Sequence, residues 1–203
     1  MRIAILVEGD TEKAFFPVLR EFLKPRLSGR MPKLDAVPYN GRLPKATRLK
    51  RDVERLLKGR KHPADAVIAL TDVYTGSNDF GDAADAKSKM RQWVGDEPRF
   101  YPHAAQYEFE AWLLPYWDEI QRLAGHNRGA PGDNPEEVNH NNPPSRRLKE
   151  IFRAGTRRTD YVKWRDAARI LRGQDLRTAI NACSELKAFV NTILKLCQGE
   201  LIP

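Results

Sequence analysis

Acidic side chains follow three apolar runs of the sequence, at the point where each run ends. Glu8 comes directly after the run that ends at Val7, and Asp72 closes the run "AVIALTD". Glu108 and Glu110 come just after a third run. In an open α/β sheet, the loops that follow the carboxyl ends of parallel strands meet at one edge. We therefore expect these carboxylates to lie near one another.

Carboxylates gathered at one place repel each other, and this repulsion predicts a bound cation. Glu12 follows Glu8 by about one helical turn and can join the group. Mg²⁺ and Mn²⁺ are hard ions that prefer oxygen ligands. The sequence therefore predicts a divalent-metal site, whose candidate ligands are Glu8, Glu12, Asp72, Glu108 and Glu110.

Each acid also has a plainer interpretation. Glu12 can complement the positive end of the helix that follows it, and Asp72 can be an ordinary helix cap. If Glu108 and Glu110 are both helical, their side chains diverge by about 200° and cannot face one ion. If Glu108 still belongs to the strand end, this objection is weaker. Glu8 is the hardest to explain in this way, because an acid that ends a buried aliphatic strand needs a partner.

The elements that must position these acids alternate between strand and helix, which favours an α/β fold with a mainly parallel sheet. Hydrophobic periodicity predicts strands over residues 2–7, 34–39, 64–72 and 99–106. Helices are expected over residues 11–24, 46–57 and 86–94, and over the run "YEFEAWLLPYWDEIQRL" directly after the fourth strand.

The same pattern predicts a division of the chain. Residues 1–124 are expected to form a catalytic core, and residues 145–203 a basic helical extension packed on it. Residues 125–144 are rich in Gly, Asn and Pro and predict a loop, either functional or disordered. Cys183 and Cys197 fall in one predicted final helix, about 20 Å apart if it is unbroken, and are expected to be reduced.

The net charge of +8 is concentrated in two segments. Residues 42–61 contain nine Lys or Arg against two acids, and residues 146–172 contain ten against three. Such a protein can hold a polyanion while it keeps cations at a carboxylate cluster, although solvated helix faces explain each run equally well. The candidate nucleic-acid contacts are Arg48, Arg51, Arg55, Arg146, Arg147, Arg157 and Arg158.

Several other classes of protein are not supported by the sequence. No window has the length and apolarity of a membrane span, and the N-terminus lacks the zones of a signal peptide, so a cytoplasmic protein is expected. The four histidines show no zinc spacing, and no phosphate loop of the G-x-x-x-x-G-K-[ST] type occurs.

The stretch "ILVEGDTE", followed by a strand that ends in "LTD", resembles the TOPRIM fold of topoisomerases, primases and the OLD (overcoming lysogenization defect) nucleases. The likeness is closest to an uncharacterised bacterial group of TOPRIM-like proteins, domain of unknown function family 4276. It extends over nearly the whole chain, through "AQYEFEAWLL", "PPSRRLKEIF" and "DYVKW". A TOPRIM-like fold with a C-terminal helical extension is therefore expected.

This resemblance also implies roles for individual residues. Glu8 would be the central metal-binding and catalytic carboxylate, and Lys163, within "DYVKW", would be a catalytic lysine, its plainer interpretation being a phosphate-contacting or solvated side chain. The further metal ligands that it implies are Glu12, Asp72, Glu108 and Glu110. The sequence departs from the pattern at Tyr74, where TOPRIM nucleases usually have the second acid of Asp-x-Asp. Candidate replacements are Asp79, Asp82, Asp85 and Glu108.

The activity implied by the resemblance is metal-dependent hydrolysis of DNA, with a separately encoded ABC- or AAA-type ATPase as partner, in phage defence. Trp164, next to the second basic segment, can stack on an unpaired base or belong to the core. Two alternatives stay open: a non-catalytic module that docks on an ATPase or nucleic acid, and a TOPRIM nuclease that processes RNA. An oligomer is compatible with the sequence.

Overall fold

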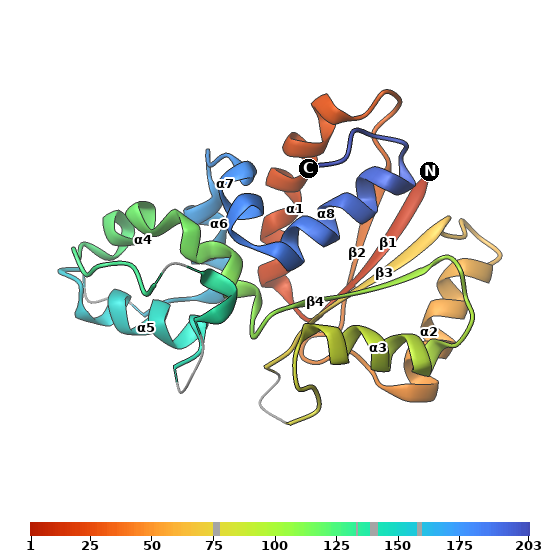
Figure 1. The fold of residues 1–203 in the computed structure, drawn as a ribbon, viewed down its shortest axis with the longest axis horizontal. Helices are drawn as coiled ribbons and strands as arrows, with labels where there is room; N and C mark the ends of the chain where they lie inside the picture. Colours follow the sequence, from red (N-terminus) through yellow and green to blue (C-terminus); the bar gives the residue numbers. More distant parts are fainter. Residues whose placement is uncertain (75–77, 133, 139–141, 158–159) are drawn as a thin grey trace.

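The computed structural model describes residues 1–74, 78–132, 134–138, 142–157 and 160–203. Four strands form one sheet in the order β2-β1-β3-β4, and all three pairings are parallel. Their bounds are Arg2–Val7 for β1, Lys33–Pro38 for β2, Ala66–Asp72 for β3 and Phe100–Ala105 for β4. The expected α/β fold with a parallel sheet is confirmed (Figure 1).

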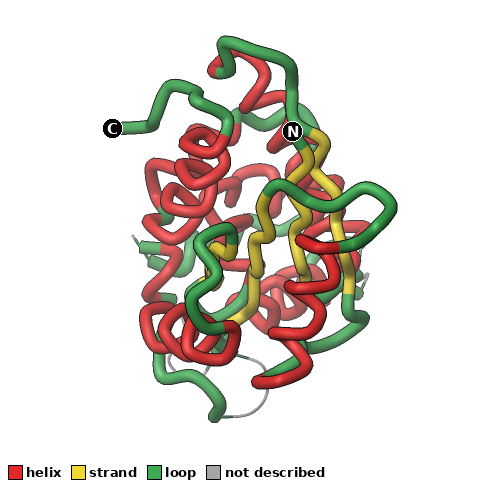
Figure 2. Tube along the Cα trace, turned by 90° about the vertical axis from the view of Figure 1, so that its right-hand side faces the viewer, coloured by secondary structure: helices red, strands yellow, loops and turns green. Residues whose placement is uncertain are grey.

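Helices cover both faces of this sheet (Figure 2). The odd-numbered residues of β1, Ile3 to Val7, pack with α1 (Asp10–Leu23) and α8 (Ser184–Leu196). The even-numbered residues Ala4 and Leu6 pack with α2 (Ala46–Lys58) and α3 (Ala83–Val94). Successive strand side chains point to opposite faces, so only a strand that is aliphatic throughout can be buried between two helical layers. Pro38, which cannot donate to a ladder, lies on the edge strand β2.

The second half of the chain is helical and extends the core on one side of the sheet. Beside the sheet, α4 (Trp117–Ala124) and α5 (Pro144–Ala154) lie next to each other, as Figure 1 shows. They are joined to α1 through α6 (Lys163–Leu171) and α7 (Leu176–Ala182), and one continuous apolar cluster includes residues of all these helices. Short 3₁₀ helices occur at Lys24–Arg26 (η1) and Pro135–Glu137 (η3).

Two of the expected helices are wrong in detail. The segment after β4 is not one α-helix but the 3₁₀ helix η2 (Phe109–Tyr116) followed by α4. Nearly every residue of η2 is buried, so no polar face guides an α-helical turn, and Pro115 lacks the N–H that such a turn needs. The final helix is interrupted at Cys183, whose backbone is extended, so that α7 and α8 are separate.

A buried carboxylate that the sequence analysis did not single out stabilises this interruption. Glu136 accepts hydrogen bonds from the Ser184 hydroxyl at 2.9 Å and from the Glu185 N–H at 3.1 Å, at the first turn of α8. It also accepts one from the indole N–H of Trp112 at 3.1 Å. An anion at a helix N-terminus satisfies free N–H groups and complements the helix dipole. The two cysteines flank α8, and both are free thiols in the described structure.

No helix in the described parts of the chain is long and apolar enough to cross a membrane. The division of the chain at residues 125 and 145 stays a prediction. Within residues 125–144, the described part has η3 as its one short helix before α5 begins at Pro144.

The start of α6, which carries Lys163, depends on Asp166. This fully buried carboxylate accepts a hydrogen bond from the Val162 N–H at 2.8 Å and pairs with Arg165 and Arg169 at 2.8 and 2.9 Å. Burial opposes its ionisation, but these partners outweigh burial and lower the pKa of Asp166. The carboxylate therefore contributes stability above its unfolded pKa, and this contribution is lost as the pH falls through the lower folded value.

We predict that Asp166→Ala lowers the free energy of unfolding by about 2 kcal/mol, because it removes a cap and leaves the Val162 N–H unpaired. In a chain of this length the melting temperature should fall by about 4–8 °C. Calorimetric melting near pH 7 measures this, and the difference should shrink in acid. Asp160→Ala is the matched control: its exposed pair with Arg153, at 2.9 Å, should contribute less than about 0.5 kcal/mol. Equal losses in both variants would contradict the assignment.

Candidate functional site

A pocket of about 510 Å³ opens at the edge of the sheet where the parallel strands end. All the side chains predicted to bind metal line this pocket, together with the predicted catalytic lysine. These residues are Glu8, Glu12, Asp72, Glu108, Glu110 and Lys163. Segments that are far apart in the sequence are thus brought to one place by the parallel topology, as expected.

Glu8 is held in the pocket by the neighbouring strand. Its Oε1 accepts hydrogen bonds from the Thr71 hydroxyl and from the Asp72 N–H, the latter at 3.3 Å. On its other side, the Gly41 N–H donates to the Glu8 carbonyl at 2.7 Å. Burial raises the pKa of the Glu8 carboxyl, although the hydrogen bonds from Thr71 and Asp72 and the charge of Arg42 oppose the shift. Glu8 and Asp72 therefore meet across the junction of β1 and β3.

Asp72 links the end of β3 to the segment that carries the other acids. Its Oδ1 accepts a hydrogen bond from the Phe109 N–H at 2.9 Å. Burial raises its pKa well above the usual value, and the charges of Glu8, Glu12 and Glu110 raise it further. Glu12, in the first turn of α1, is 5% exposed, and burial followed by the charge of Glu8 raises its pKa as well. The charges of Glu8, Glu12 and Glu110 thus all act on the Asp72 carboxyl.

Glu108 and Glu110 do not diverge as two residues of one α-helix would. Glu108 has an extended backbone, and Glu110 lies in the first turn of η2. The residue before them, Tyr107, has a φ of 69°, in the left-handed region that is unfavourable for a large side chain. Its carbonyl accepts a hydrogen bond from the Tyr74 N–H at 2.6 Å. This turn brings both acids to the pocket.

Glu108 also has a structural role at the start of α5. It accepts hydrogen bonds from the Ser145 N–H at 2.8 Å and from the Ser145 hydroxyl at 2.9 Å. Ser145 is the second residue of α5, so the carboxylate satisfies a free N–H and complements the helix dipole there. One of the five predicted ligands is therefore already engaged as a helix cap.

Lys163 is the cation that the described structure pairs directly with these acids, while Arg42 also lines the pocket. Its Nζ lies 3.1 and 3.2 Å from the two carboxylate oxygens of Glu110 and 4.0 Å from Glu108. Burial of the ammonium opposes ionisation, but Glu110, Glu108 and Asp72 outweigh it and raise the pKa of Lys163. Glu110 is 1% exposed, and its Oε1 has no partner with hydrogen-bond geometry in the described structure. Lys163 is thus a fixed positive charge that neutralises only part of the cluster.

The donor chemistry of the pocket fits a divalent cation. The candidate ligands are carboxylate oxygens, and burial and mutual repulsion raise the pKa of four of the five acids, a penalty that a bound cation would relieve. Glu110 Oε1 has no hydrogen bond there, and its one ion-pair partner in the described structure is Lys163 Nζ, at 3.1 Å. As the side chains lie, however, no three acidic, histidine or cysteine groups among the described residues are grouped closely enough to hold one ion. The ligands are therefore gathered but not closed into a coordination shell.

Three of the four candidate replacements for the missing second acid are engaged elsewhere. Asp79 pairs with Lys45, Asp82 accepts a hydrogen bond from the Asp85 N–H at 2.7 Å, and Asp85 pairs with Lys89 at 2.8 Å. None of these three lines the pocket, whereas Tyr74 itself does and is 50% exposed. Glu108 thus remains the one candidate replacement that lines the pocket. Thr71, Ser145 and Arg42 are site residues that the sequence analysis did not identify, since no local pattern distinguishes them, and it identified Tyr74 only as a departure from the TOPRIM pattern.

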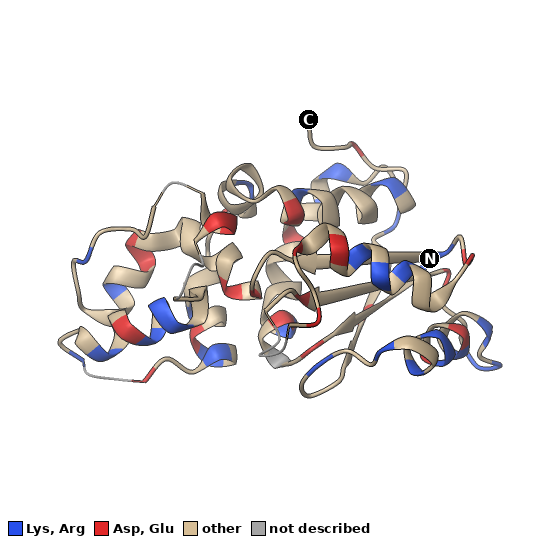
Figure 3. Ribbon diagram, turned by 60° about the horizontal axis from the view of Figure 1, so that its bottom comes forward, with Lys and Arg blue, Asp and Glu red and all other residues tan. Residues whose placement is uncertain are grey.

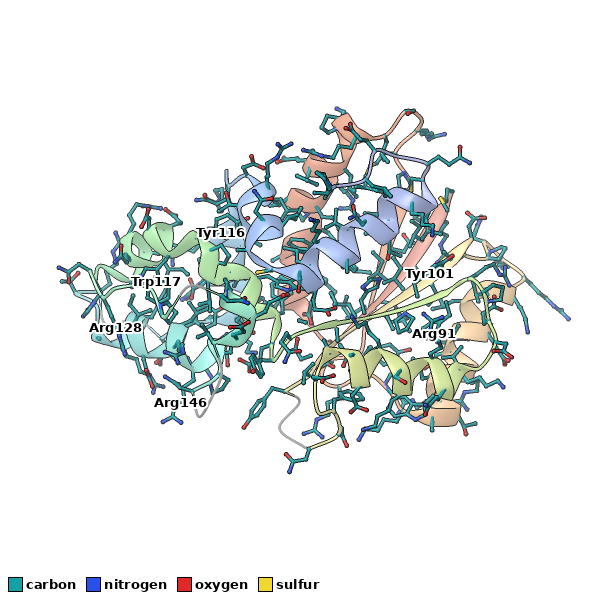
Figure 4. The ribbon with its side chains drawn as sticks, viewed as in Figure 1. Arg91, Tyr101, Tyr116, Trp117, Arg128 and Arg146 are labelled. Carbon is teal, nitrogen blue, oxygen red and sulfur yellow. The ribbon has the colours of Figure 1, made fainter. Side chains whose placement is uncertain are left out.

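Figure 3, with Lys and Arg in blue, shows basic residues on the α2 side of the molecule and on the α4–α5 side. Both segments adjoin the pocket, whose lining includes Arg42, before α2, and Glu108, which binds Ser145 of α5. Arg48, Arg51 and Arg55 are on the exposed face of α2, whose preceding loop contributes Arg42 to the pocket. Of the predicted contacts in the second segment, Arg146 and Arg157 are exposed. Arg147 is half-buried and donates a hydrogen bond to the Asn142 carbonyl at 3.0 Å. Arg158 lies outside the described residues. Arg146 and Arg128, labelled in Figure 4, share Glu150 at 3.5 and 3.7 Å on the α4–α5 side.

We predict that Asp72→Asn stabilises the metal-free protein at neutral pH. A carboxyl whose folded pKa is raised becomes destabilising as the pH rises above its unfolded pKa, and asparagine keeps the acceptor for the Phe109 N–H. The melting temperature in EDTA should rise by about 2–5 °C at pH 7.5, and this gain should vanish towards pH 4. Asp118→Asn, at an exposed acid in the first turn of α4, should give no gain at either pH. A lower melting temperature for Asp72→Asn at pH 7.5 would refute the predicted repulsion.

Solved structures with the same architecture come from OLD proteins. The chain is similar to the C-terminal region of the Burkholderia pseudomallei OLD protein, with a TM-score of 0.54 and 16% identity over 97% of this chain and 98% of that one. It is also similar to the C-terminal region of the Xanthomonas campestris pv. campestris OLD protein, with a TM-score of 0.50 and 14% identity over 97% and 95% of the two chains. At these identities the likeness establishes the TOPRIM-like fold.

Among curated proteins, none matches this sequence. A protein-family model does match it, and the match includes the predicted acids, Lys163 and the helices that follow. The model is described as "Domain of unknown function (DUF4276)" and matches residues 7–194. The chain therefore belongs to the DUF4276 family.

Proposed function

We propose that the protein is a divalent-metal-dependent nuclease of TOPRIM type that hydrolyses phosphodiester bonds in DNA. The observation that supports this most is the meeting of Glu8 and Asp72 in one pocket with Glu12, Glu110 and Lys163. Polyanion binding requires positive charge, and both basic segments adjoin this pocket, through Arg42 before α2 and through Glu108 at the start of α5. The similarity in fold to the OLD C-terminal regions is consistent with the same chemistry.

Glu8, Asp72 and Glu12 would hold Mg²⁺ or Mn²⁺ in this site, with Glu110 as a further ligand. When bound, such ions lower the pKa of a water nucleophile and stabilise the leaving oxygen of a phosphodiester. Thr71 and the Phe109 N–H orient the Glu8 and Asp72 carboxylates, which reduces the reorganisation that binding would need. Lys163 keeps its proton and presents a positive charge where a phosphate oxygen would lie.

The basic surfaces would hold the nucleic-acid backbone without reading its sequence. Exposed arginines contact phosphates irrespective of base, so Arg48, Arg51 and Arg55 on α2 and Arg146 and Arg157 near α5 would position the strand. RNA carries the same backbone charge, so a structured RNA is a second substrate class. The chain has no phosphate loop, and we propose that a separately encoded ABC- or AAA-type ATPase acts with it, in phage defence.

A non-catalytic module is the second candidate function, and two observations favour it. Tyr74 replaces an acid of the TOPRIM pattern, and the described acids are not closed around one ion. In that case the pocket would be a degraded site, and the chain would dock on an ATPase or on nucleic acid. Metal binding and cleavage distinguish the two functions.

We predict that Mn²⁺ raises the melting temperature of the wild-type protein by about 5–10 °C when its concentration is near a hundred times the dissociation constant. Glu8→Gln should remove most of this shift and reduce the nicking of plasmid DNA in Mn²⁺ by roughly a hundredfold, because it replaces a charged ligand by a neutral one. Differential scanning calorimetry and gel electrophoresis measure the two effects.

Glu21→Gln, at an exposed glutamate on α1, is the control and should behave as the wild type. If purified protein binds Mn²⁺ neither before nor after the ATPase is added, and cuts neither plasmid nor structured RNA, the docking module is the correct function. Preferential cleavage of the RNA would instead assign the RNA-processing alternative.

We further predict that replacing Arg48, Arg51 and Arg55 together by Gln weakens DNA binding by roughly tenfold at moderate salt. Each lost phosphate contact should also reduce the slope of log affinity against log salt by about 0.9. Fluorescence anisotropy at several salt concentrations measures both. Replacing Lys24, Arg30 and Lys195 by Gln removes the same charge at exposed positions that do not line the pocket and should have a smaller effect. Equal effects of the two triple variants would indicate a response to net charge alone.

A further inference from the structure

Tyr74 is an exposed aromatic side chain at the entrance to a pocket whose other functional groups are charged. Large hydrophobic side chains that are strongly exposed in the described structure are Met1, Tyr74, Trp164 and Leu201. Of the two aromatic ones, Tyr74 lines the pocket, whereas Trp164, which follows Lys163 in α6, does not. An exposed aromatic elsewhere on a surface needs no explanation, but one that lines a pocket of buried charged groups indicates a ligand with a flat apolar face.

The depth of the acids restricts what can reach them. Glu12 and Glu110 are 5% and 1% exposed, and the pocket of about 510 Å³ has the size of a small-molecule site. A duplex, whose major groove alone is about 12 Å wide, is too large to enter such a pocket. A single strand can place one nucleotide in it, because an unpaired base is free to leave the stack.

We propose that Tyr74 is a stacking platform for an unpaired base, and that the pocket therefore takes nucleic acid with a single-stranded or frayed segment. This inference rests on the proposed function in that nucleic acid is the ligand, and it adds the substrate class. Stacking on an aromatic ring is independent of sequence, since every base has a π-face. It therefore suits a protein whose other expected contacts are to phosphates.

The backbone around Tyr74 fits this role. Its N–H donates to the Tyr107 carbonyl at 2.6 Å, and the Val73 N–H donates to the Ala105 carbonyl at 3.1 Å. The main chain is therefore anchored to the segment that leads to Glu108, while the ring is half exposed. A platform that is fixed at its base and open to solvent loses little conformational entropy when a ligand stacks on it. In the TOPRIM pattern this position is an acid, so the substitution would exchange a metal ligand for a base contact.

The test compares a labelled single-stranded oligonucleotide of mixed sequence with the same strand annealed to its complement. Fluorescence anisotropy with the full chain is measured in Ca²⁺ and again in EDTA. We expect the single strand to bind roughly tenfold tighter than the duplex, and Tyr74→Ala to weaken single-strand binding roughly tenfold while duplex binding changes less than about twofold. Tyr74→Phe keeps the ring and should bind as the wild type.

Leu201→Ala is the matched control, because Leu201 is similarly exposed, at 52%, but does not line this pocket. Equal affinity for the two DNA forms, equal losses for Tyr74→Ala and Tyr74→Phe, or an equal loss of both DNA forms in Tyr74→Ala would overturn the inference. Cleavage in Mn²⁺ is measured separately. A ring-dependent preference for single strands without cleavage would support the inference and count against the nuclease function. Cleavage without any dependence on the ring would support the nuclease function and count against the inference.

Discussion

Negative charge concentrated at one edge of a parallel sheet is the constraint on which the rest of this structure depends. Every strand of the sheet runs in the same direction, so the acids that follow β1, β3 and β4 reach the same pocket. Burial and mutual repulsion make their ionisation costly there, as the raised pKa values of Glu8, Asp72 and Glu110 indicate. A fold keeps such a cluster only when local dipoles and cations compensate it. The compensation that the structure provides is partial, which is consistent with a site that binds a further cation.

The groups that compensate the acids also hold the helical half of the molecule in place. The Phe109 N–H binds Asp72, and Ser145 at the start of α5 binds Glu108, while Lys163 at the start of α6 pairs with Glu110. Each contact joins the edge of the sheet to a different helical element. The position of α5 and α6 is therefore coupled to the charge state of the pocket. A change in pH or in bound cations is thus expected to affect both the chemistry of the site and the stability of the helices around it.

Positive and negative side chains occupy different parts of the described structure. Positive charge lies on exposed faces of α2 and near α5 (Figure 3), whereas the acids that line the pocket are mostly buried. Phosphates of a bound strand would be attracted to the periphery, and only a segment narrow enough to enter the pocket would reach the carboxylates. Tyr74 and Lys163, both lining the pocket, supply an apolar face and a positive charge. This arrangement suits a polyanion whose individual units have one charged and one aromatic part.

The sequence by itself determined the strands, the parallel sheet and the convergence of the acids, because buried parallel strands are aliphatic throughout and their ends must meet at one edge. It did not determine the 3₁₀ helix η2 or the interruption at Cys183, which depend on burial of a uniformly apolar segment and on capping by the distant Glu136. Lys163 was identified only through a family resemblance, and Tyr74 only as a departure from it. Their places in the pocket, and the diversion of Glu108 to Ser145, were decided by the tertiary structure, since these contacts join residues dozens of positions apart. Local sequence patterns indicate which side chains of a segment are buried, whereas hydrogen-bond and ion-pair partners from distant segments determine the role of each charged group.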